Sequence, residues 1–230
     1  MTAEAPSAPA AMTLLLATAN RGKLAELRAL LADLPFDVAS LAEVLPGAPP
    51  VVEDGATFRD NALLKARAAV AAARVVTIAE DAGLEVDALG GRPGVRSARY
   101  AKEGATDAEN NAALLKALAE VEDGQRAARF RCVMVLVDPW AEGSEGTGGH
   151  EVVVEGRCEG AIARVPRGGG GFGYDPLFVV EGSDRTMAEL GEDEKNALSH
   201  RAQAVAALRP ALLELVERRI AAAARIGGGP

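Results

Sequence analysis

Two adjacent acids at the end of a short β-branched run restrict the possible folds of this chain more than any other feature. Residues 75–79 read VVTIA and predict a buried strand, which Glu80 and Asp81 follow directly. We expect the strand to end at these acids and the chain to turn sharply at Gly83, because glycine tolerates unusual backbone angles. In an open α/β sheet, ligands bind outside the carboxyl ends of strands, where two carboxylates could hold a hard cation. A solvated acidic turn would produce the same pattern.

Strand-like runs alternate with helical patterns along most of the chain. Strands are predicted at residues 13–17, 84–89, 130–137 and 150–165, the last as one bent strand or two shorter ones. Helices are predicted after residues 18–23, after Thr57, after Thr106, and from about residue 200, where Pro210 favours a kink. Residues 35–56 contain four prolines and predict little regular structure. This alternation predicts an α/β fold with a mixed β-sheet flanked by helices.

Length and charge narrow the possible functions. A chain of 230 residues suits a single domain, which we expect at residues 12–226, between disordered tails at 1–11 and 227–230. The formal net charge of -8 argues against nucleic acid or an anionic membrane as a partner, because both need a clustered basic face. No apolar segment approaches the roughly 20 residues that span a bilayer. A small phosphorylated ligand stays open, since a few local cations suffice.

The cysteines and histidines indicate a compartment and exclude one class of site. Cys132 and Cys158 lie in apolar, strand-like runs, and no secretory signal precedes them. We expect buried free thiols in a reducing compartment, and therefore a cytoplasmic protein, although the sequence leaves a disulfide open. His150 and His200 have no cysteine cluster nearby, so we do not expect a zinc site.

Residues 18–23, which read TANRGK, join the first predicted strand to a helix. Such a turn directs backbone N–H groups and the positive end of the helix at one point, which suits phosphate oxygens. Thr18, Asn20 and Lys23 add a hydroxyl, an amide and an ammonium group. The spacing GxxxxGK[ST] of a P-loop is absent. A capped helix with an incidental lysine would explain the same residues.

The glycine-rich stretch 168–178 reads GGGGFGYDPLF and contains a formal G-x-G-x-x-G match. Asp175 precedes Pro176, which disfavours the helix that a dinucleotide site needs at this point. A loop that presents Phe172, Tyr174 and Asp175 suits a flat ring better, because an aromatic ring can stack on a base while a carboxylate accepts its N–H. The alternative is a glycine turn with Phe172 in the core.

His200 and Arg201 open the last predicted helix, with Ser199 as a plausible N-cap. Cations in a first helical turn oppose the helix dipole, so this placement favours a nearby anion or an acceptor-rich ring. Two ordinary surface residues would also fit.

Five blocks of sequence together resemble the non-canonical purine nucleoside triphosphate pyrophosphatases, the inosine/xanthosine triphosphate pyrophosphatase or Ham1-like family. The blocks, in the family's order, are TANRGK (18–23), EDGATFRDNALLKA (53–66), AEDAGLEVDALGGRPGVRSARYA (79–101), GGFGYDP (170–176) and EKNALSHRAQA (194–204). The resemblance implies a two-lobed sheet with a central cleft. It also implies hydrolysis of inosine, deoxyinosine and xanthosine triphosphates (ITP, dITP and XTP) to the monophosphate and pyrophosphate, which cleanses the nucleotide pool, and it implies a homodimer.

The resemblance assigns a role to each matching residue. Asp81 would be the general base, and magnesium would be organised by Glu53, Glu80 and Asp81. The triphosphate would be held by Thr18, Ala19, Asn20, Arg21, Gly22, Lys23 and Lys65. The base pocket would comprise Phe172, which stacks on the purine, with Gly173, Tyr174, Asp175, Lys195, His200 and Arg201. Ala82 departs from the family's usual Asp-Asp-Ser-Gly and lacks the serine hydroxyl that would contact the substrate.

Two other functions remain open from the sequence. One is a pyrophosphatase for modified pyrimidine or canonical nucleotides, which the blocks GGFGYDP and SHR disfavour. The other is a non-catalytic nucleotide-binding module, which would have less need for Glu53 and Asp81 beside two lysines.

Overall fold

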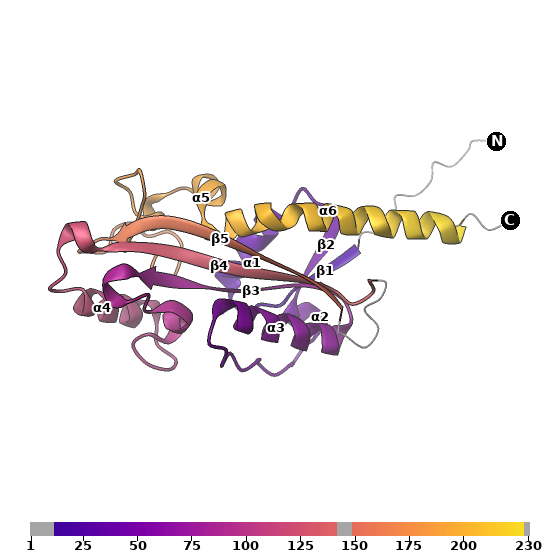
Figure 1. Ribbon diagram of the computed structural model, residues 1–230, viewed down its shortest axis with the longest axis horizontal. Helices are drawn as coiled ribbons and strands as arrows, with labels where there is room; N and C mark the ends of the chain where they lie inside the picture. The colour runs from indigo at the N-terminus through magenta and orange to yellow at the C-terminus, as the bar shows by residue number, and fades with distance from the viewer. Residues whose placement is uncertain (1–11, 142–148, 228–230) are drawn as a thin grey trace.

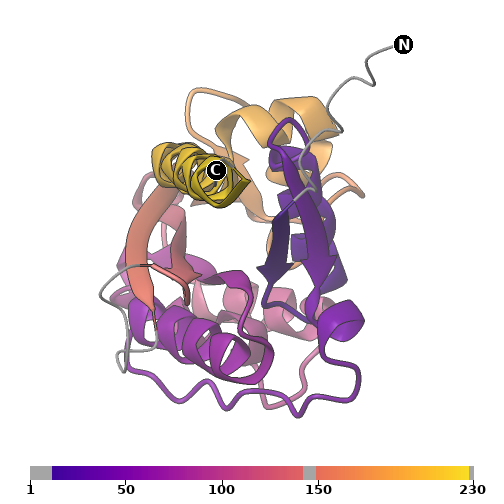
Figure 2. The same cartoon turned by 90° about the vertical axis from the view of Figure 1, so that its right-hand side faces the viewer.

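The computed structural model describes residues 12–141 and 149–227 of the chain, which assemble around one curled β-sheet (Figures 1 and 2). The predicted tails at 1–11 and 227–230 lie outside the described part, except for Gly227, which ends α6. The sheet has the strand order β2-β1-β3-β4-β5-β6. Its strands are β1 (Met12–Leu16), β2 (Phe36–Ser40), β3 (Val76–Val86), β4 (Ala127–Asp138), β5 (His150–Ile162) and β6 (Phe178–Val180).

The sheet is mixed, as the sequence predicts. Strand β1 pairs in parallel with β2 and β3, whereas β3, β4, β5 and β6 pair antiparallel. Parallel neighbours need a crossover, and a helix follows both β1 and β2. The longer strands β3 to β5 extend past the β1–β2 edge, which gives the molecule its elongated shape (Figure 1).

Helices cover both faces of the sheet. The α-helices are α1 (Arg21–Leu30), α2 (Leu41–Val44), α3 (Phe58–Ala73), α4 (Asp107–Ala117), α5 (Glu192–Leu198) and α6 (His200–Gly227). Short 3-10 helices are η1 (Asp87–Leu89), η2 (Gly94–Arg99), η3 (Asp123–Gln125) and η4 (Met187–Glu189). In Figure 2, α6 lies above the curled sheet and α3 below it. Among the described residues, no helix is both long and apolar enough to cross a membrane.

The core consists of three apolar clusters. One packs α1 and α6 against a face of the sheet around Leu14 and Met134. The second packs α3 against the opposite face around Ala62 and Val135. The third fills the far end of the long strands beneath α4, around Leu114. The two ends of the long strands therefore carry separate cores.

The predicted strand end at Glu80 and the predicted turn at Gly83 are wrong. Strand β3 continues through both, and Asp81 faces Val133 across the ladder with β4. The acids are tolerated in the strand because cations meet them on both faces, as described below. Gly83 serves close approach rather than a turn, since a Cβ there would lie 2.4 Å from Ser97 Oγ.

Other predictions hold or need small changes. Thr57 and Thr106 form the predicted capping boxes of α3 and α4, and Ser199 Oγ accepts the Ala202 N–H at the start of α6. Residues 150–162 form one strand, and α6 continues through Pro210. The thiols of Cys132 and Cys158 are free and buried. The segment 35–56 holds β2 and α2, which the sequence did not predict.

Arg126 connects the end of α4 to the end of β5 through hydrogen bonds to backbone carbonyls. Its side chain is buried and donates to the carbonyls of Ile162 (2.8 Å), Leu118 (2.8 Å), Val121 (3.4 Å) and Ala163 (3.2 Å). Buried carbonyl groups at the ends of helices and strands need hydrogen-bond donors, and one guanidinium supplies them here.

We expect Arg126→Met to lower the free energy of unfolding by about 3 kcal/mol, because several buried carbonyls lose their donor. Urea unfolding monitored by circular dichroism measures this change. The control is Arg157→Met, which removes an exposed arginine paired with Glu155 at 2.7 Å and should change stability by less than about 1 kcal/mol. Equal losses in the two variants would contradict the role assigned to Arg126.

Candidate active site

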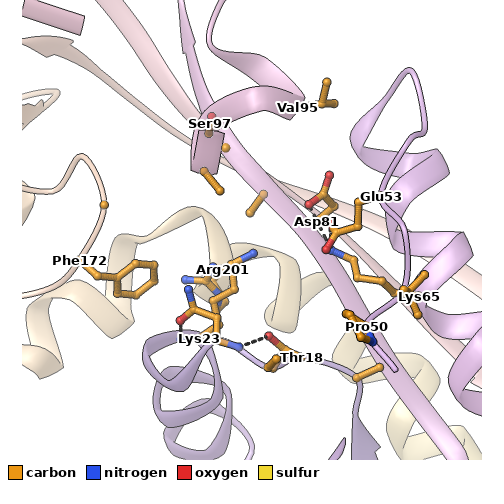
Figure 3. A pocket seen from close by; sticks show the side chains of 18 of the residues that line it. Thr18, Lys23, Pro50, Glu53, Lys65, Asp81, Val95, Ser97, Phe172 and Arg201 are labelled. Carbon is orange, nitrogen blue, oxygen red and sulfur yellow. Dashed lines mark hydrogen bonds and ion pairs between the residues drawn. The ribbon is translucent and has the colours of Figure 1, made fainter. Parts of the chain in front are cut away.

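A cleft of about 650 Å³ gathers most of the residues that the sequence singled out. Figure 3 shows Phe172 at one side, Glu53, Asp81 and Lys65 at the other, and Lys23 and Arg201 between them. The predicted residues that line it are Thr18, Ala19, Asn20, Lys23, Glu53, Lys65, Asp81, Ala82, Phe172, Gly173, Tyr174, Asp175, Lys195, His200 and Arg201. Arg21, Gly22 and Glu80 are not among the lining residues.

Two carboxylates share one lysine at the acidic end of the cleft. Lys65 Nζ on α3 lies 2.7 Å from Glu53 Oε2 and 3.2 Å from Asp81 Oδ1. Asn61, one turn earlier on α3, donates to Asp81 Oδ2 at 3.0 Å. Asn61 and Lys65 thus share one face of α3, and both side chains hold the same aspartate.

The segment that carries Glu53 has no regular structure of its own and is held from outside. The Asn61 side-chain oxygen accepts the Gly55 N–H at 2.8 Å, and Arg99 donates to the Glu53 carbonyl at 3.0 Å. Sequence reasoning gave no role to Arg99, which lies in the quoted block 79–101 and is 46 residues from Glu53 in the sequence. Arg99 also lines the cleft.

Burial and the neighbouring charges shift the pKa values of Asp81 and Lys65. Burial raises the pKa of Asp81 above the ordinary aspartate value, against the lowering effect of Lys65, Lys23 and the Asn61 amide. Burial opposes the charge of Lys65, yet Asp81 and Glu53 raise its pKa above the ordinary lysine value. Asp81 is consequently a stronger proton acceptor than a solvated aspartate, beside an ammonium that stays charged.

The N-terminus of α1 forms another wall. The Asn20 side-chain oxygen accepts the Lys23 N–H at 3.0 Å, and Thr18 Oγ1 accepts the Asn20 N–H at 3.2 Å. The turn is thus capped, as one sequence interpretation holds, and it still presents Thr18, Asn20 and Lys23 to the cleft. Gly22 lets the Phe172 ring come close to the start of α1, because a Cβ there would lie 2.7 Å from that ring.

The glycine loop places an aromatic ring beside two cations. The Phe172 ring centroid lies 5.0 Å from Lys195 Nζ and 5.8 Å from Arg201 Cζ. Asp175 Oδ2 accepts from the Phe172 N–H at 3.0 Å and from Lys195 Nζ at 2.7 Å. Gly171 has a φ of 72°, and a Cβ there would lie 2.0 Å from Asp175 Oδ2, so only glycine fits.

Tyr174 of the same loop is buried, and its hydroxyl donates to the Ser97 carbonyl at 2.9 Å.

Six charged side chains of alternating sign connect the glycine loop to Lys23, in the order Asp175, Lys195, Glu26, Arg201, Glu80 and Lys23. We call this series the charge chain. Lys195 lies 2.7 Å from Glu26, and Arg201 pairs with both Glu26 and Glu80. Sequence reasoning missed Glu26, although its position three residues after Lys23 puts it one turn along α1.

His200 lies on the aromatic side of the cleft. Its ring stacks on Phe130 with centroids 4.8 Å apart. Burial, followed by the charge of Arg201, lowers the pKa of His200 well below the ordinary histidine value, so the ring is neutral at pH 7. Among the described residues, its Nδ1 atom is buried without a hydrogen-bond partner. A neutral ring with a free nitrogen can meet a donor or an acceptor of a ligand.

The structure separates Glu80 from Glu53 and Asp81. Successive residues of a strand face opposite sides of the sheet, and Glu80 turns toward Arg201 and Lys23, away from Lys65. Among the described residues, no group of three or more His, Cys, Asp or Glu side chains is placed to hold a metal ion. The acidic end therefore offers two carboxylates, Glu53 and Asp81.

This geometry suits an elongated anion attached to a flat ring. A ring can stack on Phe172 and meet the polar groups of Asp175, Lys195 and Arg201. Anionic groups can then reach the N-terminus of α1, Lys23 and Lys65. Ala82 lines the middle of the cleft and can offer only its backbone there.

Comparison with known proteins agrees with this geometry. The family model described as the Ham1 family matches residues 14–211. The dITP/XTP pyrophosphatase of Geobacillus kaustophilus is 48% identical over 203 residues, 88% of this chain and 95% of that protein. That of Mycobacterium tuberculosis strain H37Rv is 49% identical over 205 residues, 88% and 96% of the two chains. Among solved structures, a HAM1 protein from Coxiella burnetii has a TM-score of 0.77 at 42% identity and covers 88% of this chain and 99% of that one.

We expect Glu26→Gln to lower the free energy of unfolding by about 2 kcal/mol, because Lys195 and Arg201 lose an anion in a mostly buried position. Differential scanning calorimetry measures the change. The matched control is Asp33→Asn, which removes an exposed acid that also pairs with α6, through Arg209 at 2.8 Å, and should leave stability nearly unchanged. An equal effect of both changes would show that the charge chain does not stabilise the fold.

Proposed function

This chain belongs to the Ham1 family, and from that premise we propose that it hydrolyses non-canonical purine nucleoside triphosphates to the monophosphate and pyrophosphate. The proposed substrates are ITP, dITP and XTP, whose removal cleanses the nucleotide pool. The observation that carries the proposal is the meeting of Asp81, Lys23 and Phe172 in one cleft.

The aromatic side of the cleft would bind the base. Inosine and xanthosine present a 6-oxo acceptor and an N1–H donor, whereas adenine presents an amino donor and an N1 acceptor. Lys195 and Arg201 supply donors, and Asp175 supplies an acceptor. The 6-oxo group and the N1–H of an oxidised purine stacked on Phe172 would therefore both find hydrogen-bond partners. Adenine would leave buried polar groups unpaired, and such mismatches discriminate strongly.

The opposite side would bind the triphosphate. Thr18, Ala19 and Asn20 face the cleft with Lys23 at the start of α1, and Lys65 lies beside Asp81. A helix N-terminus attracts phosphate oxygens through free N–H groups and the helix dipole. Lys23 and Lys65 would balance the negative charge that grows on the departing pyrophosphate.

The donor set at Glu53 and Asp81 fits a magnesium ion. Magnesium prefers oxygen ligands and is commonly held by one or two carboxylates together with substrate phosphates. Glu53 and Asp81 already approach one shared cation, Lys65, at 2.7 and 3.2 Å. When bound, the ion would supply charge neutralisation for the phosphate groups.

The hydrolytic step then follows from the residues. Asp81 would accept a proton from a water molecule whose oxygen attacks the α-phosphorus, while the bond between that phosphorus and the bridging oxygen breaks. Asn61 and Lys65 hold the Asp81 carboxylate in place from two directions. The raised pKa of Asp81 favours this proton transfer.

Two further proposals concern the setting of the enzyme. The free buried thiols support a reducing compartment, for which we propose the cytoplasm. We propose a homodimer on the family resemblance alone.

We expect purified protein to release pyrophosphate from ITP and XTP at least about a hundredfold more efficiently than from ATP, as polar mismatches of this kind allow. Release should require magnesium. A coupled pyrophosphate assay over a panel that includes ATP, GTP and pyrimidine triphosphates, with and without chelator, measures both properties. Equal turnover of ATP, or a preference for a pyrimidine nucleotide, would refute the proposal.

We expect Asp81→Asn to lower kcat for ITP about a thousandfold, since general base catalysis contributes on this scale, while affinity for the nucleotide changes little. Steady-state kinetics and calorimetric titration separate the two effects. Normal turnover by the variant would remove Asp81 from the catalytic step. Asp87→Asn, an acid paired with Arg129 at 2.9 Å and outside the cleft lining, serves as the control.

A further inference from the structure

Glu80 and Asp81 are neighbours in sequence but belong to different surroundings. Strand β3 turns Asp81 toward α3, where Asn61 and Lys65 hold it. It turns Glu80 to the other face, where Cys132 of β4 and Arg201 of α6 contact it. Glu80 is 2% exposed and is not among the residues that line the cleft. A cation bound by Glu53 and Asp81 would therefore lie on the opposite face of β3 from the Glu80 side chain.

The Glu80 carboxylate has no acceptor capacity left. Its Oε2 atom accepts from Arg201 Nε at 2.9 Å and from Cys132 Sγ at 3.0 Å. Its Oε1 atom accepts from Arg201 Nη2 at 2.9 Å and lies 3.2 Å from Lys23 Nζ. A carboxylate offers about four lone-pair positions, so these four contacts fill it. The bidentate geometry with Arg201 also fixes the plane of the guanidinium.

The two cations that Glu80 holds serve different parts of the cleft. Arg201 lies 5.8 Å from the Phe172 ring, at the base side. Lys23 stands at the start of α1 beside Thr18 and Asn20, at the phosphate side. Figure 3 shows Arg201 and Lys23 close together in the middle of the cleft, between Phe172 and Asp81. One carboxylate therefore sets the spacing between a base-facing donor and a phosphate-facing donor.

We propose that Glu80 is a positioning residue that couples recognition of the base by Arg201 to recognition of the phosphates by Lys23, and that it does not bind the metal. The inference rests on the proposed function. Loss of its charge would free Lys23 and loosen Arg201. The donor that binds the base and the donor that binds the phosphates would then no longer be held at a fixed distance from each other.

The test compares Glu80→Gln with Glu53→Gln, using ITP and ATP over a magnesium series. We expect Glu80→Gln to lower kcat/KM for ITP at least about tenfold and to reduce the preference for ITP over ATP at least about threefold. Its magnesium requirement should stay within about twofold of the wild type. Glu53→Gln should do the reverse, with about a tenfold higher magnesium requirement and an unchanged preference.

Metal binding is measured independently of activity, with manganese as the probe and electron paramagnetic resonance of the nucleotide-free protein as the readout. We expect Glu80→Gln to bind manganese like the wild type and Glu53→Gln to bind it more weakly. The matched control for removing an acid from β3 is Glu85→Gln, which breaks a 2.9 Å pair with Arg131 outside the cleft lining and should match the wild type throughout.

Weaker manganese binding or a higher magnesium requirement in Glu80→Gln would make Glu80 a metal ligand and overturn the proposal. Wild-type kinetics and preference in that variant would overturn the positioning role. If Glu80→Gln does not fold, Glu80→Asp takes its place; it keeps the charge but shortens the reach to Arg201 and Lys23, so we expect a smaller loss of the preference for ITP over ATP, with manganese binding unchanged. If the wild type releases no pyrophosphate from ITP, the proposed function fails, while the manganese measurement still decides whether Glu80 binds metal.

Discussion

The structure depends on giving each charge that it buries a partner, either an opposite charge or, for Arg126, backbone carbonyls. A buried ion without a partner costs several kcal/mol, so a protein that needs cations and anions within its interior must arrange them together. The charge chain meets this need, because each of its internal members lies between two residues of opposite sign. Its residues come from α1, β3, the glycine loop, α5 and α6. These segments lie far apart in sequence. The ion pairs that hold them together also position the charged side chains that line the cleft.

Strand β3 is the axis of this arrangement. It pairs with β1 on one side and β4 on the other, so its backbone is satisfied along the shared registers and leaves the side chains to specify the two faces. Alternation places Glu80 in the charge chain and Asp81 at the acidic end of the cleft. One dipeptide thus supplies both a structural anion and a candidate proton acceptor, because burial prevails in setting the pKa of Asp81 and the surrounding cations prevail in setting that of Glu80. Burial alone would raise the pKa of Glu80, but Arg201 and then Lys23 hold it below the ordinary glutamate value.

Sequence patterns predicted the local structure well where the signal is local. Capping boxes at Thr57 and Thr106, the cap at Ser199 and the mixed sheet follow from short-range rules. The end of β3 could not be placed in this way, since two acids and a glycine usually interrupt a strand and only tertiary partners keep them in it. Glu26 and Arg99 were missed for a related reason. Glu26 contacts Arg201, and Arg99 contacts the Glu53 carbonyl. Both contacts join positions distant in sequence, so no local residue spacing predicts them.

The distribution of charge in the cleft bears on the proposed need for a divalent cation. At the acidic end, the two carboxylates of Glu53 and Asp81 share the single ammonium of Lys65, which leaves a local excess of negative charge. Lys23 is also partly neutralised, by Glu80. A triphosphate that enters without a metal would bring further negative charge to this excess and would be repelled from the carboxylate that should act on it. A divalent cation held by Glu53 and Asp81 would reverse the local sign, so that this end of the cleft would attract the phosphates. Lys65 alone cannot balance both carboxylates, which is the physical reason to expect a divalent cation to accompany the nucleotide.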